Sequence, residues 1–234
     1  MSAASVISDL LTRHTHEIGP LLNLDVNSDK ICVLDLSHHN HNISVDHLQD
    51  TAAFDVLIHQ LMERQNANVG LGGYLEDRKI YERSTLFEGS DQYRSIHLGV
   101  DIWADAGTEV LAPLDGKVHS FRDNNNFGDY GPTLILEHQL EKKKFYTLYG
   151  HLSRSSLIGL VEDNVFRKGE RIGWIGNYPE NGNWPPHLHF QIITDMEGRK
   201  GDFPGVVAKQ EREKYQQLCP DPNLIVRCQL LNKR

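Results

Sequence analysis

The sequence lacks the features of a membrane-spanning or nucleic-acid-binding protein. No apolar stretch approaches the ~20 residues that a membrane-spanning helix needs. Lys and Arg number 24 against 32 Asp and Glu, which gives a net charge of −8. A protein that follows phosphate groups normally has a basic excess or a basic stripe instead. We therefore expect neither a membrane nor a nucleic acid as a partner.

Cysteine is also scarce, and the first residues do not form an export signal. Cys32, Cys219 and Cys228 are an odd number without the paired spacing of a metal site. Residues 1–9 lack both the basic region and the continuous apolar core of a secretory signal. Since disulfides are rare in reducing compartments, the simplest interpretation is a reduced, cytoplasmic protein.

The composition is otherwise typical of a soluble globular protein, with 39% apolar and 24% charged residues. A chain of 234 residues can form one large domain or a core domain with an appendage. The character of the sequence changes near residue 90, which favours the second arrangement. We expect a helix- and strand-containing extension over residues 1–90 packed on the core, a β domain over 91–200 and a C-terminal tail over 201–234.

The first 90 residues carry helix and strand signals. Apolar spacing predicts a short helix that ends at Gly19-Pro20 and a longer helix from about Asp46 to Gln65. Between them, residues 31–36 form the apolar run typical of a buried strand.

From about residue 96 the pattern becomes one of short strands separated by Pro, Gly and Asn. Asp115-Gly116 lies between two alternating segments, which is a strong signal for a hairpin. Too few helices intervene for a parallel sheet. The sequence therefore predicts a mainly β fold with a compact antiparallel sheet, and an α+β chain overall because of the N-terminal extension.

Three histidine-containing elements stand out in this part of the chain. His187 and His189 alternate in a strand-like run, so both rings face one side, and they can supply two metal ligands or one ligand and one acid–base group. Four residues of flat strand span ~13 Å, so His97 and Asp101 can share an ion only if the backbone bends, which Gly99 permits. His151 follows another β-rich run.

Each element alone has an ordinary structural interpretation, such as a histidine beside a turn capped by an aspartate. Together they are far more specific. Two histidines and one carboxylate leave a tetrahedral zinc ion with an open position for water, which is the catalytic pattern. The remaining two histidines are then free for proton transfer and charge stabilisation.

The order and spacing of the motifs resemble the lysostaphin/LytM family of zinc endopeptidases over roughly residues 95–195. The matching segments are 97–101 (H-x-x-x-D), 107–118 (G-T-x-V-x-A-P-x-D-G-x-V), 149–153 (Y-G-H-L-S), 169–176 (G-x-x-I-G-x-x-G) and 187–190 (H-L-H-F).

The resemblance implies an antiparallel β core with the metal in a groove. It assigns one Zn²⁺ to His97, Asp101 and His189, with His151 and His187 flanking the attacking water and the developing oxyanion. One of these two histidines would remove the water proton and the other would steady the oxyanion. Members of the family mostly cut peptide cross-links of bacterial cell walls, so we expect a peptidoglycan-endopeptidase-like hydrolase of peptide or amide bonds.

The loop before H-x-H departs from the family's usual small, Gly-rich form. Residues 177–186 are longer and bulkier, so we expect Trp184 to line the groove and the substrate to be a small peptide or amide. Arg78, Tyr81 and Arg83 precede the first ligand, where an arginine fork could bind a substrate carboxylate.

A second resemblance leads to an alternative function. The chain is similar to the peptidase-like module of some bacterial multidomain proteins, where it lies between a kinase-like domain and a class III aminotransferase. Such a module would be intracellular and non-lytic, stabilised by its metal and partnering a metabolic enzyme.

Overall fold

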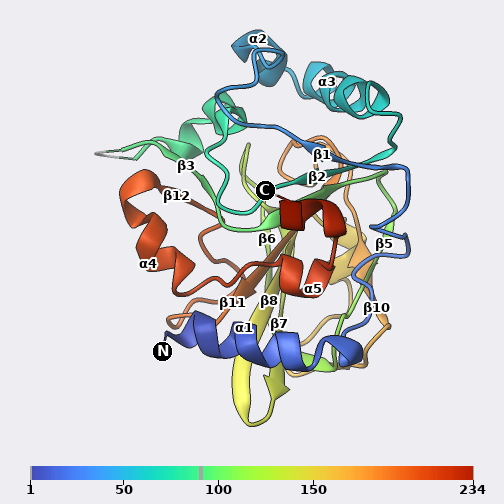
Figure 1. Cartoon of the computed structure of the whole chain (residues 1–234), viewed down its shortest axis with the longest axis vertical. Coiled ribbons are helices and arrows are strands. Elements are labelled where there is room, and N and C mark those ends of the chain that lie inside the picture. The colour runs from blue at the N-terminus through green and yellow to red at the C-terminus, as the bar shows by residue number, and fades with distance from the viewer. Residues whose placement is uncertain (1, 90–91, 234) are drawn as a thin grey trace.

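The computed structural model describes residues 2–89 and 92–233. The helices are α1 (Ala3–Arg13), α2 (Val45–Gln49), α3 (Thr51–Glu63), α4 (Arg212–Gln216) and α5 (Asn223–Val226). The strands are β1 (Ile31–Leu34), β2 (Val69–Gly72), β3 (Arg94–His97), β4 (Val100–Trp103), β5 (Glu109–Leu111), β6 (Gly116–Asn124), β7 (Gly131–Leu140), β8 (Lys143–Gly150), β9 (Val165–Phe166), β10 (Arg171–Trp174), β11 (His187–Ile193) and β12 (Val206–Ala208). The mainly β class with helix near the N-terminus is confirmed (Figure 1).

One large sheet organises the chain. Its eight strands lie in the order β1-β2-β4-β11-β8-β7-β6-β9. β1 and β2 are parallel, and the other neighbours in this sheet pair antiparallel. Two small sheets, β10-β5 and β12-β3, lie beside it. The N-terminal strands β1 and β2 are therefore hydrogen-bonded into the same sheet as β4 and β11.

The two faces of the sheet bury different side chains. Val100, Ile102, Leu188 and Phe190 belong to the cluster that also contains the buried face of α1. The alternating residues of β4 and β11 point to the opposite face, since successive side chains of a strand alternate. That opposite face carries both histidines of β11. Figure 1 shows α1 along one end of the molecule and α2 and α3 at the other.

The helix expected from Asp46 to Gln65 is instead two helices, α2 and α3, separated at Asp50. The Asp50 carboxylate accepts a hydrogen bond from the Ala53 backbone N–H at 2.8 Å, which caps α3. The cap requires extended backbone at Asp50, and the continuous apolar pattern of the sequence conceals this break.

The hairpin expected at Asp115-Gly116 is wrong. β5 pairs with β10, whereas β6 pairs with β7 and β9, so the two segments that flank the turn belong to different sheets. The Asp115 carboxylate is bound by the Lys168 backbone N–H and the Arg167 side chain, both at 2.8 Å. These contacts hold the chain where it crosses between sheets.

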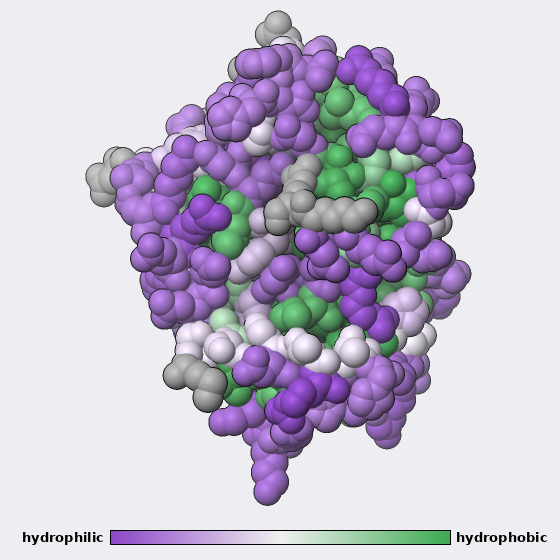
Figure 2. Space-filling model, in the orientation of Figure 1, coloured by the Kyte–Doolittle hydropathy of each residue, from purple (hydrophilic) through white to green (hydrophobic). Residues whose placement is uncertain are grey.

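Most of the molecular face in Figure 2 is hydrophilic, with smaller hydrophobic areas between the polar side chains. Within residues 2–89 and 92–233, no helix combines the length and apolar character needed to cross a bilayer.

Candidate metal centre

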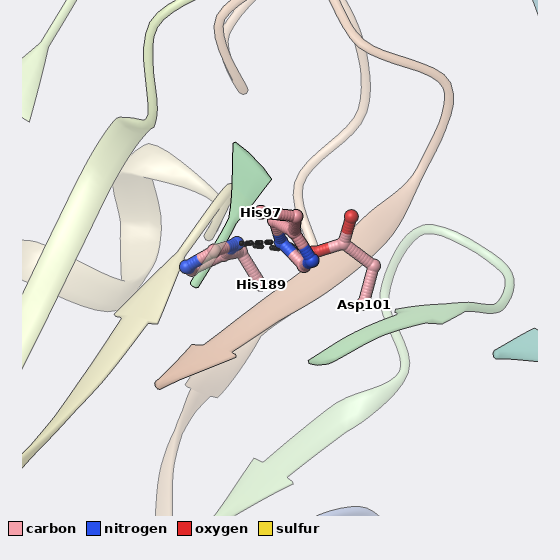
Figure 3. A group of neighbouring side chains, drawn as sticks. All are labelled: His97, Asp101 and His189. Carbon is pink, nitrogen blue, oxygen red and sulfur yellow. Dashed lines mark hydrogen bonds and ion pairs between the residues drawn. The ribbon is translucent and has the colours of Figure 1, made fainter. Parts of the chain in front are cut away.

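Three side chains, from β3, β4 and β11, point toward one another (Figure 3). Asp101 on β4 lies directly opposite His189 on β11 in the strand register. His97 ends β3, and the chain turns through Leu98 and Gly99 into β4. This turn between two strands brings His97 and Asp101 together, as the bend inferred from their spacing required. In the described ranges, it is the one group of three His, Cys, Asp or Glu side chains close enough to share an ion.

Gly99 also makes room for the site. A Cβ atom at this position would lie 2.5 Å from His189 Cε1 and 2.8 Å from the Phe190 carbonyl oxygen. Gly99 is not one of the described glycines with a left-handed φ. The structural need for glycine is therefore space for the His189 ring rather than an unusual backbone conformation.

The hydrogen bonds around the two histidines determine their tautomers. His97 Nδ1 lies 3.0 Å from the Gly73 carbonyl oxygen, so it carries the proton and donates it. His189 Nε2 lies 3.1 Å from Gln191 Oε1, an amide oxygen that can only accept. In the neutral form each ring carries one N–H, and these contacts then leave His97 Nε2 and His189 Nδ1 bare. Burial lowers the pKa of His97 to about 3, which keeps that ring neutral.

The bare nitrogen atoms and one carboxylate oxygen face one another. His97 Nε2 and His189 Nδ1 are 2.9 Å apart, and Asp101 Oδ1 lies 3.0 Å from His189 Nδ1 and 3.2 Å from His97 Nε2. Burial alone would raise the pKa of Asp101, but the Arg78 guanidinium beside it holds that pKa well below its usual range. Three acceptor atoms that face one another at these distances form a group that could hold a cation.

The geometry of this group fits a zinc ion. Ligands bound at about 2.0 Å with tetrahedral angles lie roughly 3.3 Å apart, close to the three separations here. The mixed nitrogen and oxygen donor set, three in number, is also that of catalytic zinc sites, which keep a fourth position for water. His97, Asp101 and His189 therefore form a donor set that fits the metal inferred from the sequence.

His151 and His187 lie beside this group, and each donates a hydrogen bond from its Nδ1 to a backbone carbonyl. Their ring centres are 4.2 Å apart. His151 Nδ1 donates to the Asn181 carbonyl oxygen and His187 Nδ1 donates to the Pro185 carbonyl oxygen, each at 2.8 Å. Both acceptors belong to the loop over residues 177–186, so this loop selects the tautomer that leaves each Nε2 bare. The sequence indicated that the loop would border the groove, but it contained no signal for this role.

Burial keeps both of these histidines neutral. It lowers the pKa of His187 to about 4 and lowers the pKa of His151 well below its ordinary value, with His187 adding to the effect on His151. Neutral imidazoles with a bare Nε2 can accept protons. Trp103 stacks on the His187 ring with 4.1 Å between ring centres, which holds that ring in place.

A pocket opens onto these groups. It measures about 220 Å³ and is lined by Asp101, His151, His187 and His189 together with residues from outside the central strands. The aromatic side of its wall contains Tyr81, Phe87 and Trp184. Residues 202–206, which lead into β12 and include its first residue, also line the pocket.

The structure separates the four residues expected to contact the substrate, and Arg78 is completely buried outside the pocket lining. Trp184 and Tyr81 line the pocket. Arg83 is buried behind Trp184, with its guanidinium 4.7 Å from the Trp184 ring centre and one nitrogen donating to Thr51 Oγ1 at 2.9 Å. Arg83 is not part of the pocket lining.

Some residues of the site were not found from the sequence. Tyr130 lines the pocket, and its hydroxyl lies 3.4 Å from His189 Nε2. Gln191, two residues after His189 on the same face of β11, selects the His189 tautomer. A period-2 extension of H-x-H could have suggested Gln191, whereas Tyr130 lies 59 residues from its histidine and left no local signal.

The sequence profile described as Peptidase family M23 matches residues 95–202. These residues form an M23 peptidase domain. The match contains all five residues of the inner site, namely His97, Asp101, His151, His187 and His189. It ends before residues 203–206 of the pocket wall and begins after Gly73, Arg78 and Tyr81.

Curated relatives share this domain and little else of their length. An uncharacterized metalloprotease of Haemophilus influenzae is 37% identical over 97 residues, and glycyl-glycine endopeptidase ALE-1 of Staphylococcus capitis is 33% identical over 99 residues. The matches cover 41% and 42% of this chain. They cover only 18% and 25% of the relatives, so the chain spans a quarter or less of those proteins.

Two solved structures match about the same fraction of this chain as the curated relatives do. The catalytic domain of lysostaphin from Staphylococcus simulans is 24% identical, with a TM-score of 0.37 over 51% of this chain and 80% of that one. A zinc-containing peptidase from Vibrio cholerae is 27% identical, with a TM-score of 0.33 over 42% of this chain and 27% of that one.

Proposed function

We propose that the protein is a zinc-dependent metallopeptidase-like hydrolase that cleaves a peptide or amide bond with metal-activated water. The observation that carries the proposal is the convergence of three acceptor atoms, His97 Nε2, His189 Nδ1 and Asp101 Oδ1, in tautomers that leave no proton among them. One Zn²⁺ held there would polarise a carbonyl and lower the pKa of water toward about 7.

The remaining residues of the site would move the proton. His151 and His187 each present a bare Nε2, so one accepts the proton of the attacking water and returns it to the leaving amine. The second ring is proposed to steady the developing oxyanion once the proton taken from the water has passed to it from the first ring, because only a protonated imidazole can donate through Nε2 here. The Tyr130 hydroxyl lines the same pocket and offers a further donor.

A small, soluble peptide or amide is the substrate that the pocket favours. Its wall includes Trp184, Tyr81 and Phe87 together with residues 202–206. Trp184 is held by two hydrogen bonds to Asn181, at its backbone N–H and at its carbonyl. A narrow, preorganised site loses less ordering entropy when a small ligand binds.

The test compares three substrates with the purified, zinc-loaded protein: intact cell-wall sacculi, soluble wall-derived peptides and a library of small amides. We expect chelator-sensitive hydrolysis of a small substrate and little or no lysis of sacculi. Trp184→Ala should open the wall and raise activity on larger peptides relative to the smallest ones. Efficient, chelator-sensitive lysis of sacculi would contradict the small-substrate proposal and favour a wall hydrolase.

A cytoplasmic location and a metabolic-enzyme partner, the alternative suggested by the sequence, stay predictions. Co-purification of the native protein with an aminotransferase or kinase would support the alternative, provided that the zinc-loaded protein hydrolyses no peptide or amide.

A further inference from the structure

Arg78 is a completely buried cation in contact with a residue of the metal centre. It precedes the M23 domain in the chain, yet its Nη1 donates to Asp101 Oδ2. Its Nε donates to Glu76 Oε2 at 2.9 Å, and its Nη2 donates to the Gly73 carbonyl oxygen at 3.3 Å. The side chain is thus the link between the N-terminal segment and Asp101.

The surrounding residues are shaped for this guanidinium. Gly72 on β2 lies opposite Asp101 on β4 in the strand register. A Cβ atom at Gly72 would overlap Arg78 Nη2. Glu76 is itself held, because its Oε1 accepts a hydrogen bond from the Leu36 backbone N–H at 3.0 Å. The contacts therefore connect the segment that follows β1, through Glu76 and Arg78, to Asp101.

The two oxygens of Asp101 have different partners. Oδ1 faces His97 and His189, while Oδ2 accepts from Arg78. An oxygen bound to a guanidinium is not available to a metal on the other side. We propose that Arg78 is a positioning residue that limits Asp101 to one-oxygen metal binding and so keeps a coordination position free for water and substrate. This inference rests on the proposed metal function of the site.

The effect of Arg78 on metal affinity should be opposite to that of the two groups that accept hydrogen bonds from the histidine ligands. The Gly73 carbonyl and Gln191 accept N–H bonds, which makes the histidine ligands more basic and strengthens metal binding. Arg78 instead places a positive charge beside the carboxylate, which weakens that ligand and repels a cation. Removing Arg78 should therefore tighten zinc binding while lowering turnover. A residue that only supported the fold would weaken binding when removed.

The experiment uses the full chain and two readouts besides activity. R78M removes the charge and keeps an unbranched, apolar side chain, and the double variant E76Q/R78M removes both charges of the pair. R83M is the matched control because Arg83 is a buried arginine of the 3₁₀ helix that directly follows Arg78, Lys79–Arg83, and its side chain contacts Thr51 and Trp184 instead. Zinc affinity is measured by competition with a chelating dye, and coordination by the visible absorption of the Co²⁺-loaded protein.

We expect R78M to bind zinc on the order of tenfold more tightly, the scale of effects from residues around metal ligands. Its Co²⁺ bands should weaken, because a carboxylate that binds through both oxygens raises the coordination number. R83M should keep the wild-type spectrum and affinity. If R78M does not fold, E76Q/R78M is judged by the same expectation. Unchanged Co²⁺ bands or weaker zinc binding in a folded Arg78 variant would overturn this inference but leave the proposed function standing. A wild-type protein that binds neither ion would overturn the proposed function and this inference with it.

Discussion

The inner and outer parts of the metal centre come from different regions of the chain. The three candidate ligands and both accessory histidines lie within the M23 domain, residues 95–202. The groups that bind or cover them from outside the domain include the Gly73 carbonyl, Arg78, Tyr81, Phe87 and residues 203–206. Tyr81 and Arg78 also bond to each other, with 3.4 Å between the hydroxyl and Nη1.

From this difference we infer that the matched domain depends on residues outside it. β4 carries Asp101 and lies between β11, inside the domain, and β2, outside it. Without β2, one edge of β4 would have unpaired backbone groups. Ile7, Leu10 and Leu11 of α1 would also be missing from the cluster that covers the far face of the sheet. The flanking residues therefore support the site as well as enclose it.

The largest effect that tests this comparison is the loss of residues 1–91. A chain of residues 92–234 should not fold cooperatively, because each large apolar side chain lost from the core removes about 1.5–3 kcal/mol from a total stability of about 5–15 kcal/mol. Circular dichroism during heating and bound zinc by elemental analysis are the measurements. A cooperative transition within a few degrees of that of the full chain, with zinc bound, would show that the domain stands alone.

A pair of glycine substitutions sharpens the comparison between inner and outer parts. Gly99→Ala places a methyl group against the His189 ring and should abolish most zinc binding. Gly72→Ala places one against Arg78, so it should disturb the Asp101 contact while leaving both histidines in place. We expect Gly72→Ala to retain zinc in the folded protein and to alter the Co²⁺ absorption.

The two alanine variants are matched because each adds one methyl group at a buried glycine outside the left-handed region. Calorimetric zinc titration of both proteins checks the prediction. Equal loss of zinc in the two variants would mean that the outer contacts are as necessary for binding as the inner ones.

A smaller expected effect is the contribution of His138, a core histidine outside the site, to the pH dependence of stability. His138 is buried on β7, where its Nδ1 donates to the Asp115 carbonyl oxygen at 2.9 Å. Burial lowers its pKa from 6.5 to about 4. The folded protein therefore binds this proton less readily than the unfolded chain, and stability present above pH 6.5 is lost as the pH falls toward 4. A shift of this size corresponds to about 3 kcal/mol.

In His138→Gln, the free energy of unfolding should therefore fall by about 3 kcal/mol less than in the wild type between pH 6.5 and pH 4. Urea denaturation of both proteins at a series of pH values measures the slope. Parallel curves for wild type and variant would show that His138 does not contribute to the acid sensitivity.

The inner site was predictable because its signals are local. The alternation of His187 and His189 in a strand places both on one face, whatever the rest of the chain does. The short separation of His97 and Asp101 demanded a bend, and the structure has a turn there. The mainly β class followed in the same way from short, regularly spaced strand signals.

The outer contacts could not be predicted because they depend on which strands become neighbours. Arg78 meets Asp101 only because β2 pairs with β4, and the sequence holds no register signal for that pairing. The hairpin predicted at Asp115-Gly116 was wrong for a related reason. The flanking strands β5 and β6 pair with β10 and β7 and not with each other. The sequence suggested that Gly99 is needed for a backbone bend. In the structure its small size is what matters, because the ring of His189, 90 residues later in the chain, packs against it.

Bound zinc per chain in His189→Ala, His187→Ala and the wild-type protein tests the central claim most directly. Elemental analysis after purification should give about one zinc in the wild type and in His187→Ala, and little in His189→Ala, because only His189 presents its bare nitrogen to His97 and Asp101. Turnover by His187→Ala should fall by about 10²–10⁴, the contribution of an acid–base group. Equal zinc loss in both variants, or a wild-type protein without zinc, would contradict the assignment.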